Sequence, residues 1–352
     1  MRVVVVGATG NVGTAVLRRL AAARLTGDGR AGDEDGLQVV GVARRVPDAR
    51  VAPYDVAVWH AVDVGGPRAV DELTAVFQEA DAVVHLAWAL QPTHDIPAQH
   101  RTNVTGTANV LAAVARAGVG QVVVASSVGA YRGVDVDGKR TPVDESFPAT
   151  GIQTATYSIH KAENEAALDV FASQHPGVVV TRLRPGLVFQ RGVAAELRGL
   201  FLGHLVPMSI VRAARFAVLP LPLPFVFQAV HADDLADAFW RTIDRRAAGA
   251  FNIAATPVLT PPRMARAAGM LGAVRVPLRL LRGIVTLTWR LRLQPTDAGW
   301  LDIAAGVPIM RTDRARRELG WVPQHSAEDA LRELVGGFAD RANVEASGPL
   351  RG

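Results

Sequence analysis

The stretch Arg2-Val-Val-Val-Val-Gly7-Ala-Thr-Gly10-Asn-Val-Gly13 decides the fold. Its four valines form a short β-branched run, which is typical of a strand buried on both faces of a parallel sheet. Three glycines follow at intervals of three, and apolar residues then continue at helical spacing as far as Leu25. A strand, a glycine turn and a helix in this order predict a dinucleotide site, because the glycines let the backbone approach a pyrophosphate at the helix N-terminus.

The same alternation of strand and helix patterns continues to residue 185, which predicts an α/β fold. We expect a Rossmann-type doubly wound parallel sheet with helices on both faces and a smaller C-terminal substrate lobe. The dinucleotide-binding domain is expected over 1–185 with 230–255 returning to it, the substrate lobe over 186–229 and 256–330, and a C-terminal tail over 331–352. The predicted strands are Arg2–Val6, Leu37–Val42, Ala82–Leu86, Gln121–Ala125, Val178–Arg182 and a returning strand at Phe251–Ile253.

A second informative stretch, Tyr157-Ser-Ile-His160-Lys161, opens a run of helix formers that ends at His175-Pro176-Gly177. At a spacing of four, the phenol and the ammonium share one helix face. A nearby cation stabilises a phenolate, so we expect Lys161 to lower the pKa of Tyr157 from about 10 toward neutrality and make it a usable acid or base. His160 faces about 100° away from Lys161 and is interpreted as a surface or packing histidine.

With these motifs in place, the chain resembles an extended short-chain dehydrogenase/reductase of the NAD-dependent epimerase/dehydratase family. The resemblance covers nearly the whole length in the expected order. Segments similar to the family's later strands, helices and signatures are Asp63-Val64, Ala80–Trp88, Asn103–Leu111, Val122–Tyr131, Arg184–Phe189, Val230–Ala236 and Glu318–Pro323.

The resemblance implies a role for each matching residue. Ser127 would hydrogen-bond the substrate oxygen and Tyr157 would exchange a proton with it. Lys161 would hold the phenolate form and bond the nicotinamide ribose. The cofactor-binding residues implied by the resemblance and the glycine turn are Gly7, Thr9, Gly10, Asn11, Val12, Gly13, Arg44, Arg45, Asp63, Val64, Leu86, Ala87, Asn103, Tyr157, Lys161, Pro185, Gly186 and Val188.

The end of the second strand indicates which dinucleotide is bound. NAD-preferring proteins place a carboxylate there to bond the ribose 2′-hydroxyl. Here the strand ends Gly41-Val-Ala-Arg44-Arg45, which offers two guanidiniums and no carboxylate. Because arginine binds phosphate through paired hydrogen bonds, we expect NADP(H) in preference to NAD.

The residues around the expected site favour a ketone/alcohol oxidoreductase. Dehydratases of the resembled family carry an Asp-Glu pair directly after the catalytic hydroxyl, whereas this chain has Val128-Gly129. Nucleotide-sugar epimerases show an asparagine-containing segment after the sixth strand, where this chain has Leu183-Arg-Pro-Gly186. An apolar or cyclic small-molecule substrate is therefore expected. A nucleotide-sugar epimerase and a non-catalytic NADP(H)-binding sensor or scaffold are the alternatives.

Composition excludes several other classes. The chain has 352 residues, no cysteine and a net charge of +5, which fits a cytoplasmic protein without disulfides or cysteine-based metal sites. Its arginines are scattered and aromatic residues are 6%, so no nucleic-acid surface is expected. The histidines lack metal-ligand spacing, the first residues form a strand and not a signal peptide, and a homodimer is compatible with the sequence.

Two later segments are apolar but belong to no motif. Three prolines interrupt Phe216–Phe227, so it cannot be a transmembrane helix and is expected to run extended inside the small lobe. The stretch Val276–Leu293 is amphipathic. Along one helical stripe lie Leu278, Leu281, Val285 and Trp289, and along another lie Arg279, Arg282 and Arg290. We expect this stretch to pack within the small lobe; a membrane-surface helix or a lid over an apolar substrate are the alternatives.

Overall fold

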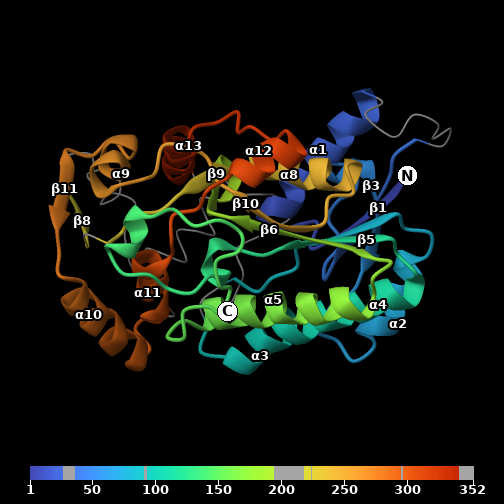
Figure 1. Cartoon of the computed structure of the whole chain (residues 1–352), viewed down its shortest axis with the longest axis horizontal. Coiled ribbons are helices and arrows are strands. Elements are labelled where there is room, and N and C mark those ends of the chain that lie inside the picture. Colours follow the sequence, from blue (N-terminus) through green and yellow to red (C-terminus); the bar gives the residue numbers. More distant parts are fainter. Residues whose placement is uncertain (27–35, 91–92, 194–217, 223, 295, 341–352) are drawn as a thin grey trace.

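The computed structural model describes residues 1–26, 36–90, 93–193, 218–222, 224–294 and 296–340. A seven-stranded sheet forms its centre, with the strand order β10-β6-β5-β4-β1-β2-β3 (Figure 1). Every pairing in this sheet is parallel, so the expected Rossmann-type doubly wound fold is confirmed. The strands are β1 (Arg2–Val6), β2 (Gln38–Ala43), β3 (Ala57–Ala61), β4 (Ala82–His85), β5 (Gln121–Ala125), β6 (Val179–Pro185) and β10 (Gly249–Ile253).

Helices cover both faces of the sheet, and β1 shows why its sequence is entirely apolar. Val3 and Val5 belong to the core on one face, whereas Val4 and Val6 belong to the core on the other. Successive side chains of a strand point to opposite faces, so a strand with two buried faces needs apolar residues throughout. One face carries α1 (Asn11–Thr26), α8 (Ala232–Asp244) and α12 (Asp313–Leu319), and the other carries α2 (Ala69–Phe77), α4 (Gly106–Ala117) and α5 (Thr156–Gln174) (Figure 1).

The sequence predicted six of the seven central strands and missed β3. This strand lies at the edge of the sheet, where Val58 is exposed and no continuous apolar run is needed. Trp59 of β3 packs over Gly41 of the neighbouring strand β2, so closely that a Cβ on Gly41 would lie 2.7 Å from the Trp59 ring. The glycine of β2 is thus explained by an edge tryptophan that sequence periodicity did not reveal.

The small lobe combines short strand pairs with helices. Its strands are β7 (Leu187–Phe189) paired with β9 (Ala229–His231), and β8 (Val218–Leu221) paired with β11 (Gly272–Arg275). Its helices are α9 (Pro261–Ala267), α10 (Leu278–Arg290), α11 (Gly299–Gly306) and α13 (Ala327–Asp340), while the short α3 (Ile96–His100) precedes α4.

Two expectations for the lobe can be compared with these elements. The boundary expected at residue 331 falls inside α13, and Leu334 of this helix is buried. In the proline-interrupted segment, 218–221 form β8 and Phe225 is buried, while residues 216, 217 and 223 lie outside the described residues.

Lys139 joins the small lobe to the dinucleotide-binding domain. Its side chain is buried, and the Nζ donates to the carbonyls of Pro224, Val226 and Ala304 at 2.8, 2.8 and 3.1 Å. Burial lowers the pKa of this amine to about 8. One side chain thus holds the segment before β9 and the end of α11 against the loop after β5.

No helix within the described ranges is long and apolar enough to cross a lipid bilayer.

Candidate active site

In the glycine turn after β1, two glycines are required by close backbone contacts and the third is not. Gly7 has φ of +86°, and a Cβ there would lie 2.5 Å from the backbone nitrogen of Ala87. A Cβ on Gly13 would lie 2.4 Å from the carbonyl oxygen of Gly7. Gly10 meets nothing closer than 3.5 Å, so the protein's own packing does not require a glycine there. An open glycine at the start of α1 is the place where a pyrophosphate would approach the backbone, and the turn fits that group.

Neighbouring residues hold the turn in place. The Nε2 of Gln190 donates to the carbonyl of Asn11 at 3.0 Å, and Arg18, two turns further along α1, donates to Gln190 at 2.9 Å. Thr9 and Val12, also expected to face the cofactor, belong to the same turn and the first turn of α1. The expected pyrophosphate turn is therefore fixed by contacts to the segment after β7.

The ends of β2 and β3 carry the residues expected around the adenosine half. Arg44 and Arg45 are exposed, and neither guanidinium has a hydrogen-bond or ion-pair partner among the described residues. Asp63 is also exposed and accepts from the backbone N–H of Gly65 at 3.0 Å, which fixes the carboxylate beside the turn. Val64 is buried, and its carbonyl accepts from Asn109 at 2.8 Å.

The turn after β4 is held by Asn103. Leu86 donates its N–H to Val6 at 2.8 Å, which places Leu86 and Ala87 beside the glycine turn. Asn103 is buried, its Oδ1 accepts from the N–H of Ala89 at 2.6 Å, and its Nδ2 donates to the Ala89 carbonyl at 3.2 Å. In this structure the Asn103 amide therefore braces the backbone of the turn.

Ser127, Tyr157 and Lys161 come together at the carboxyl end of β5. Ser127 is buried directly after this strand, and its Oγ accepts from the N–H of Gly129 at 3.0 Å. Tyr157 lies beside Ser127, because its ring and the Ser127 Oγ both border the space over Gly129. The Lys161 Nζ donates to the carbonyl of Ala125 at 2.7 Å. A Cβ on Gly129 would lie 2.8 Å from the Tyr157 ring, so the glycine makes room for the phenol.

Two tryptophans enclose Tyr157. Trp88, on the turn after β4, meets the phenol edge-on with ring centres 5.6 Å apart. Trp300 of α11 lies on the phenol from the small lobe with ring centres 5.2 Å apart. The Nζ of Lys161 lies 3.5 Å from the centre of the Trp88 ring and 5.9 Å from that of Tyr157. The Tyr157 phenol therefore lies between aromatic surfaces contributed by both lobes.

The expectation that Lys161 lowers the pKa of Tyr157 is wrong for this structure. Burial raises the pKa of Tyr157 to about 12, and the hydrogen bond with Ser127 opposes this only in part. Burial also lowers the pKa of Lys161 to about 7, against the opposite effect of Glu165. Because the amine contacts Trp88 and a carbonyl instead of the phenolic oxygen, loss of hydration governs both groups.

A buried ion-pair network below the site was not predicted. Both carboxylate oxygens of Glu165 accept from Arg184 at 2.8 Å, and Oε2 also accepts from Arg182 at 2.9 Å. Ser126 donates its hydroxyl to the same carboxylate, and Arg184 donates to Tyr131 at 3.0 Å. Glu165 lies four residues after Lys161 on α5, so this network supports the strand and the helix that carry Ser127 and Lys161.

The sequence does contain a signal for this network. Arg182 and Arg184 alternate within the otherwise apolar strand β6, so they project from the same face of a buried strand. Buried arginines require a carboxylate partner, and Glu165 is the helix residue that provides one. His160, on the same helix, is buried and packs against His100 at 5.2 Å between ring centres, which agrees with its interpretation as a packing histidine.

The segment expected to close over the nicotinamide begins at the end of β6. Gly186 follows Pro185, and a Cβ on Gly186 would lie 2.5 Å from the carbonyl of Gln228. Val188 pairs with Val230 in the strands β7 and β9. The tight approach of these two backbones explains the glycine without reference to a ligand.

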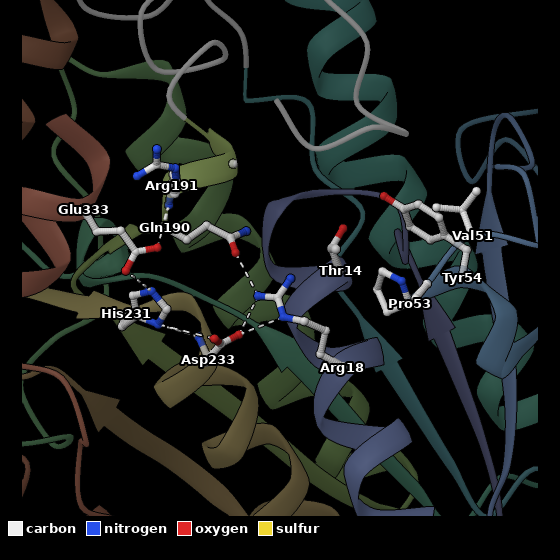
Figure 2. A pocket seen from close by; sticks show the side chains of 12 residues that line it. Thr14, Arg18, Val51, Pro53, Tyr54, Gln190, Arg191, His231, Asp233 and Glu333 are labelled. Atoms are coloured by element: carbon white, nitrogen blue, oxygen red, sulfur yellow. Dashed lines mark hydrogen bonds and ion pairs between the residues drawn. The ribbon is translucent and has the colours of Figure 1, made fainter. Parts of the chain in front are cut away.

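A cavity of about 490 Å³ lies beside the first turns of α1, and Figure 2 shows the residues that line it. Thr14, Arg18, Gln190, His231 and Glu333 are among the residues that line it, whereas Ser127, Tyr157 and Lys161 are not. Figure 2 shows Arg18 pointing toward Gln190 and Asp233 across its floor. Among the described residues, no group of three or more His, Asp or Glu side chains could hold a metal ion.

Comparison with known proteins agrees with this geometry. Residues 3–254 match the NAD dependent epimerase/dehydratase family. An uncharacterized protein of Mycobacterium tuberculosis is 25% identical over 337 residues, 95% of this chain and 30% of that protein, so the chain spans under a third of its length. A 3β-hydroxysteroid-dehydrogenase/decarboxylase isoform of Arabidopsis thaliana is 32% identical over 141 residues, 40% of this chain and 29% of that enzyme.

Among solved structures, the UDP-glucose 4-epimerase of Thermus thermophilus in complex with NAD shares the fold. Its TM-score is 0.67 at 20% identity, and the match covers 96% of this chain and 99% of the epimerase.

Proposed function

Because the chain belongs to the NAD-dependent epimerase/dehydratase family, we propose that it is an NADP(H)-dependent oxidoreductase that interconverts a ketone and a secondary alcohol. The observation that carries the proposal is that Tyr157 and the Ser127 hydroxyl lie together over Gly129, inside the enclosure of Trp88 and Trp300. Lys161 lies one turn further along the helix that carries Tyr157.

The protein's own groups handle the substrate oxygen and its proton. A bound nicotinamide supplies the hydride for reduction and accepts it for oxidation. Ser127 donates a hydrogen bond to the ketone oxygen, and Tyr157 gives that oxygen a proton as the carbon receives the hydride. The phenol then regains a proton from solvent. With its pKa raised to about 12 by burial, Tyr157 is protonated at neutral pH, the state that ketone reduction needs.

Two features support NADP(H) as the cofactor. Arg44 and Arg45 follow the strand whose end meets the adenosine ribose in dinucleotide-binding folds. Both guanidiniums are exposed and lack an ion-pair partner in the part of the chain that the structure describes. A 2′-phosphate would provide that partner through charge-assisted hydrogen bonds.

The surroundings of Tyr157 support an apolar or cyclic substrate. Trp88 and Trp300 offer aromatic surfaces, and Val128-Gly129 replaces the carboxylate pair that dehydration would use. The Arabidopsis relative, named for a steroid alcohol, supports the same substrate class.

A nucleotide-sugar epimerase is the second candidate, favoured by the fold shared with the Thermus epimerase. The deciding experiment measures nucleotide content after gel filtration and then absorbance during turnover. We expect protein that is mostly nucleotide-free and that consumes NADPH with cyclic or apolar ketones. Protein that retains NAD and converts UDP-glucose without a net absorbance change would establish the epimerase instead. Nucleotide binding without turnover of either substrate class would indicate a sensor.

A further inference from the structure

Helix α10 presents an apolar stripe to solvent. Leu280, Ile284, Leu287 and Leu291, at the end of the helix, are between 52% and 60% exposed. At about 100° per residue they fall within an arc of roughly 60° on one side of the helix. The stripe expected to pack in the small lobe, Leu278, Leu281, Val285 and Trp289, lies on the other side of the helix, where these residues are half-buried. No residue of α10 is buried, and the exposed stripe is a second one that was not identified from the sequence. Figure 1 shows α10 at an outer corner of the small lobe.

The opposite side of α10 anchors it to the protein. Arg282 forms an ion pair with Asp302 of α11 at 2.9 Å. Trp289 stacks on His94 with ring centres 5.0 Å apart and planes inclined by 11°, and its carbonyl lies 3.2 Å from the histidine Nε2. The exposed stripe thus belongs to a helix held in place by its other face.

The charged residues of α10 itself are all positive. Along the sequence, residues 245–296 contain nine arginines and no aspartate or glutamate. Arg279 and Arg290 are exposed on the flank of α10 next to the apolar stripe, and neither has an ion-pair partner among the described residues. An amphipathic helix with leucines on one side and unpaired arginines beside them is the pattern that binds in the plane of an anionic lipid surface.

We propose that α10 docks this chain on the surface of an anionic lipid bilayer. The apolar stripe would enter the boundary between headgroups and acyl chains, and the flanking arginines would meet lipid phosphates. With 13 residues, α10 is too short to span a bilayer, which needs about 20, and it therefore lies in the interface.

A second copy of the chain fits this face less well than a lipid surface does. In a twofold-symmetric contact both copies use the same patch. The positively charged flank with Arg279 and Arg290 would then meet the same positively charged flank of the second copy. Anionic headgroups provide the opposite charge to both arginines and an apolar layer for the leucines. The docking proposal needs no particular reaction at Tyr157 and does not depend on the proposed function.

Vesicle flotation of the full chain tests this surface. Vesicles of phosphatidylcholine and phosphatidylglycerol in equal parts should bind the protein at least about tenfold more tightly than phosphatidylcholine alone, and less tightly at high salt. The double variant Ile284→Ser/Leu287→Ser should bind about tenfold or more weakly, because it lacks the two apolar side chains that move from water into lipid on binding. Arg279→Gln/Arg290→Gln should weaken binding to the anionic vesicles selectively.

A matched control uses exposed valines on the dinucleotide-binding domain. Val58→Ser/Val170→Ser also removes two exposed apolar side chains and should leave vesicle binding unchanged. Thermal unfolding of each double variant checks that the fold is kept, and none of the six substituted positions is buried. Absence of binding to anionic vesicles, or equal binding by the α10 variant, would overturn the proposal. So would a vesicle-independent dimer that the α10 variant converts to a monomer, because a second copy would then cover the stripe.

Discussion

The ammonium group of Lys161 lies 3.5 Å from the centre of the Trp88 ring, so an indole and a backbone carbonyl replace most of its water. A cation on an aromatic face is attracted by the ring, but this attraction is weaker than full hydration of an ammonium. The amine therefore loses its proton more easily than an ordinary lysine. Two consequences follow for experiments at different pH values.

The first prediction is that Lys161 titrates near neutral pH. The chain contains two lysines, so a protein labelled with ¹³C-lysine gives two side-chain signals whose pH dependence can be followed by NMR. Burial should bring the pKa of Lys161 to about 7 and that of Lys139 to about 8. Lys139→Arg assigns the signals. A Lys161 signal that titrates near 10.5 would contradict the desolvation argument.

The second consequence concerns stability. The pKa of Lys161 is below its ordinary value of 10.5, so the unfolded chain binds more protons between about pH 7 and 10.5. The free energy of unfolding should therefore rise with pH in this window, because the cost of burying the charged amine is fully present below pH 7 and is relieved above it. Denaturant titrations of Lys161→Met should show a smaller rise. Identical pH slopes in both proteins would rule this out.

Catalysis should depend on the Tyr157 hydroxyl. In Tyr157→Phe the proton donor is lost while the ring and its contacts with Trp88 and Trp300 remain. We expect turnover of a ketone substrate to fall by about 10²–10⁴-fold with nucleotide affinity nearly unchanged. Tyr54→Phe, at a buried tyrosine that contacts Trp59 of the edge strand β3, is the matched control and should keep its activity. Full turnover by Tyr157→Phe would refute the proposed oxidoreductase.

Cofactor choice should depend on Arg44. Removal of a charge-assisted bond to a 2′-phosphate should weaken NADPH binding by about 1.5–3 kcal/mol in Arg44→Ala and leave NADH binding unchanged. Isothermal titration with both nucleotides measures the difference. Arg50→Ala, in the same loop but ion-paired with Asp48, is the control and should affect neither nucleotide. If the parent protein binds NADH as tightly as NADPH, then Arg44 and Arg45 are ordinary surface charges.

The buried carboxylate of Glu165 should be essential for stability. Burial alone would raise its pKa, but hydrogen bonds and charges from Arg184 and Arg182 hold it at about 2. This stabilisation is present above the ordinary value of 4.5 and is lost as pH falls toward 2. Glu165→Gln leaves the buried Arg184 without a carboxylate, while Arg182 keeps Asp169, and it should cost about 3–5 kcal/mol in urea unfolding.

A control for this loss lies on the same helix. Glu163→Gln removes a half-exposed carboxylate that lies 3.5 Å from His100, and it should change the free energy of unfolding by about 1 kcal/mol or less. Equal losses in the two variants would mean that the network contributes no more than a surface pair.

The fold was predictable because its determinants are local. The valines of β1, the glycine turn and the alternation of strands and helices follow from burial and backbone geometry within short windows. The edge strand β3 was missed because exposure removes the apolar run by which buried strands are detected.

The site was predictable only in part. The Tyr157–Lys161 spacing could be read from one helix, but the position of the Lys161 amine depends on Trp88 from a different strand end and Ala125 from a third element. Trp300 reaches Tyr157 across more than a hundred residues, and no local pattern marks it as part of the site. The sequence also does not determine which side of α10 packs against the protein. Val276–Leu293 carries apolar residues on two stripes, and only the tertiary structure shows which one is covered.

The burial of both lysines has a consequence for chemical modification. Lys139 and Lys161 are the chain's entire lysine content, and each is less than a tenth exposed, so the folded surface derives its side-chain positive charge from arginine and histidine. Acylating reagents that attack neutral amines should therefore modify little beyond the amino terminus while the protein is folded. Local opening of the small lobe would expose Lys139, and local opening of the contact between α5 and β5 would expose Lys161. Each exposed amine would then be acylated at a known position. Mass spectrometry of the acylated peptides would thus time the two openings separately, with no engineered label.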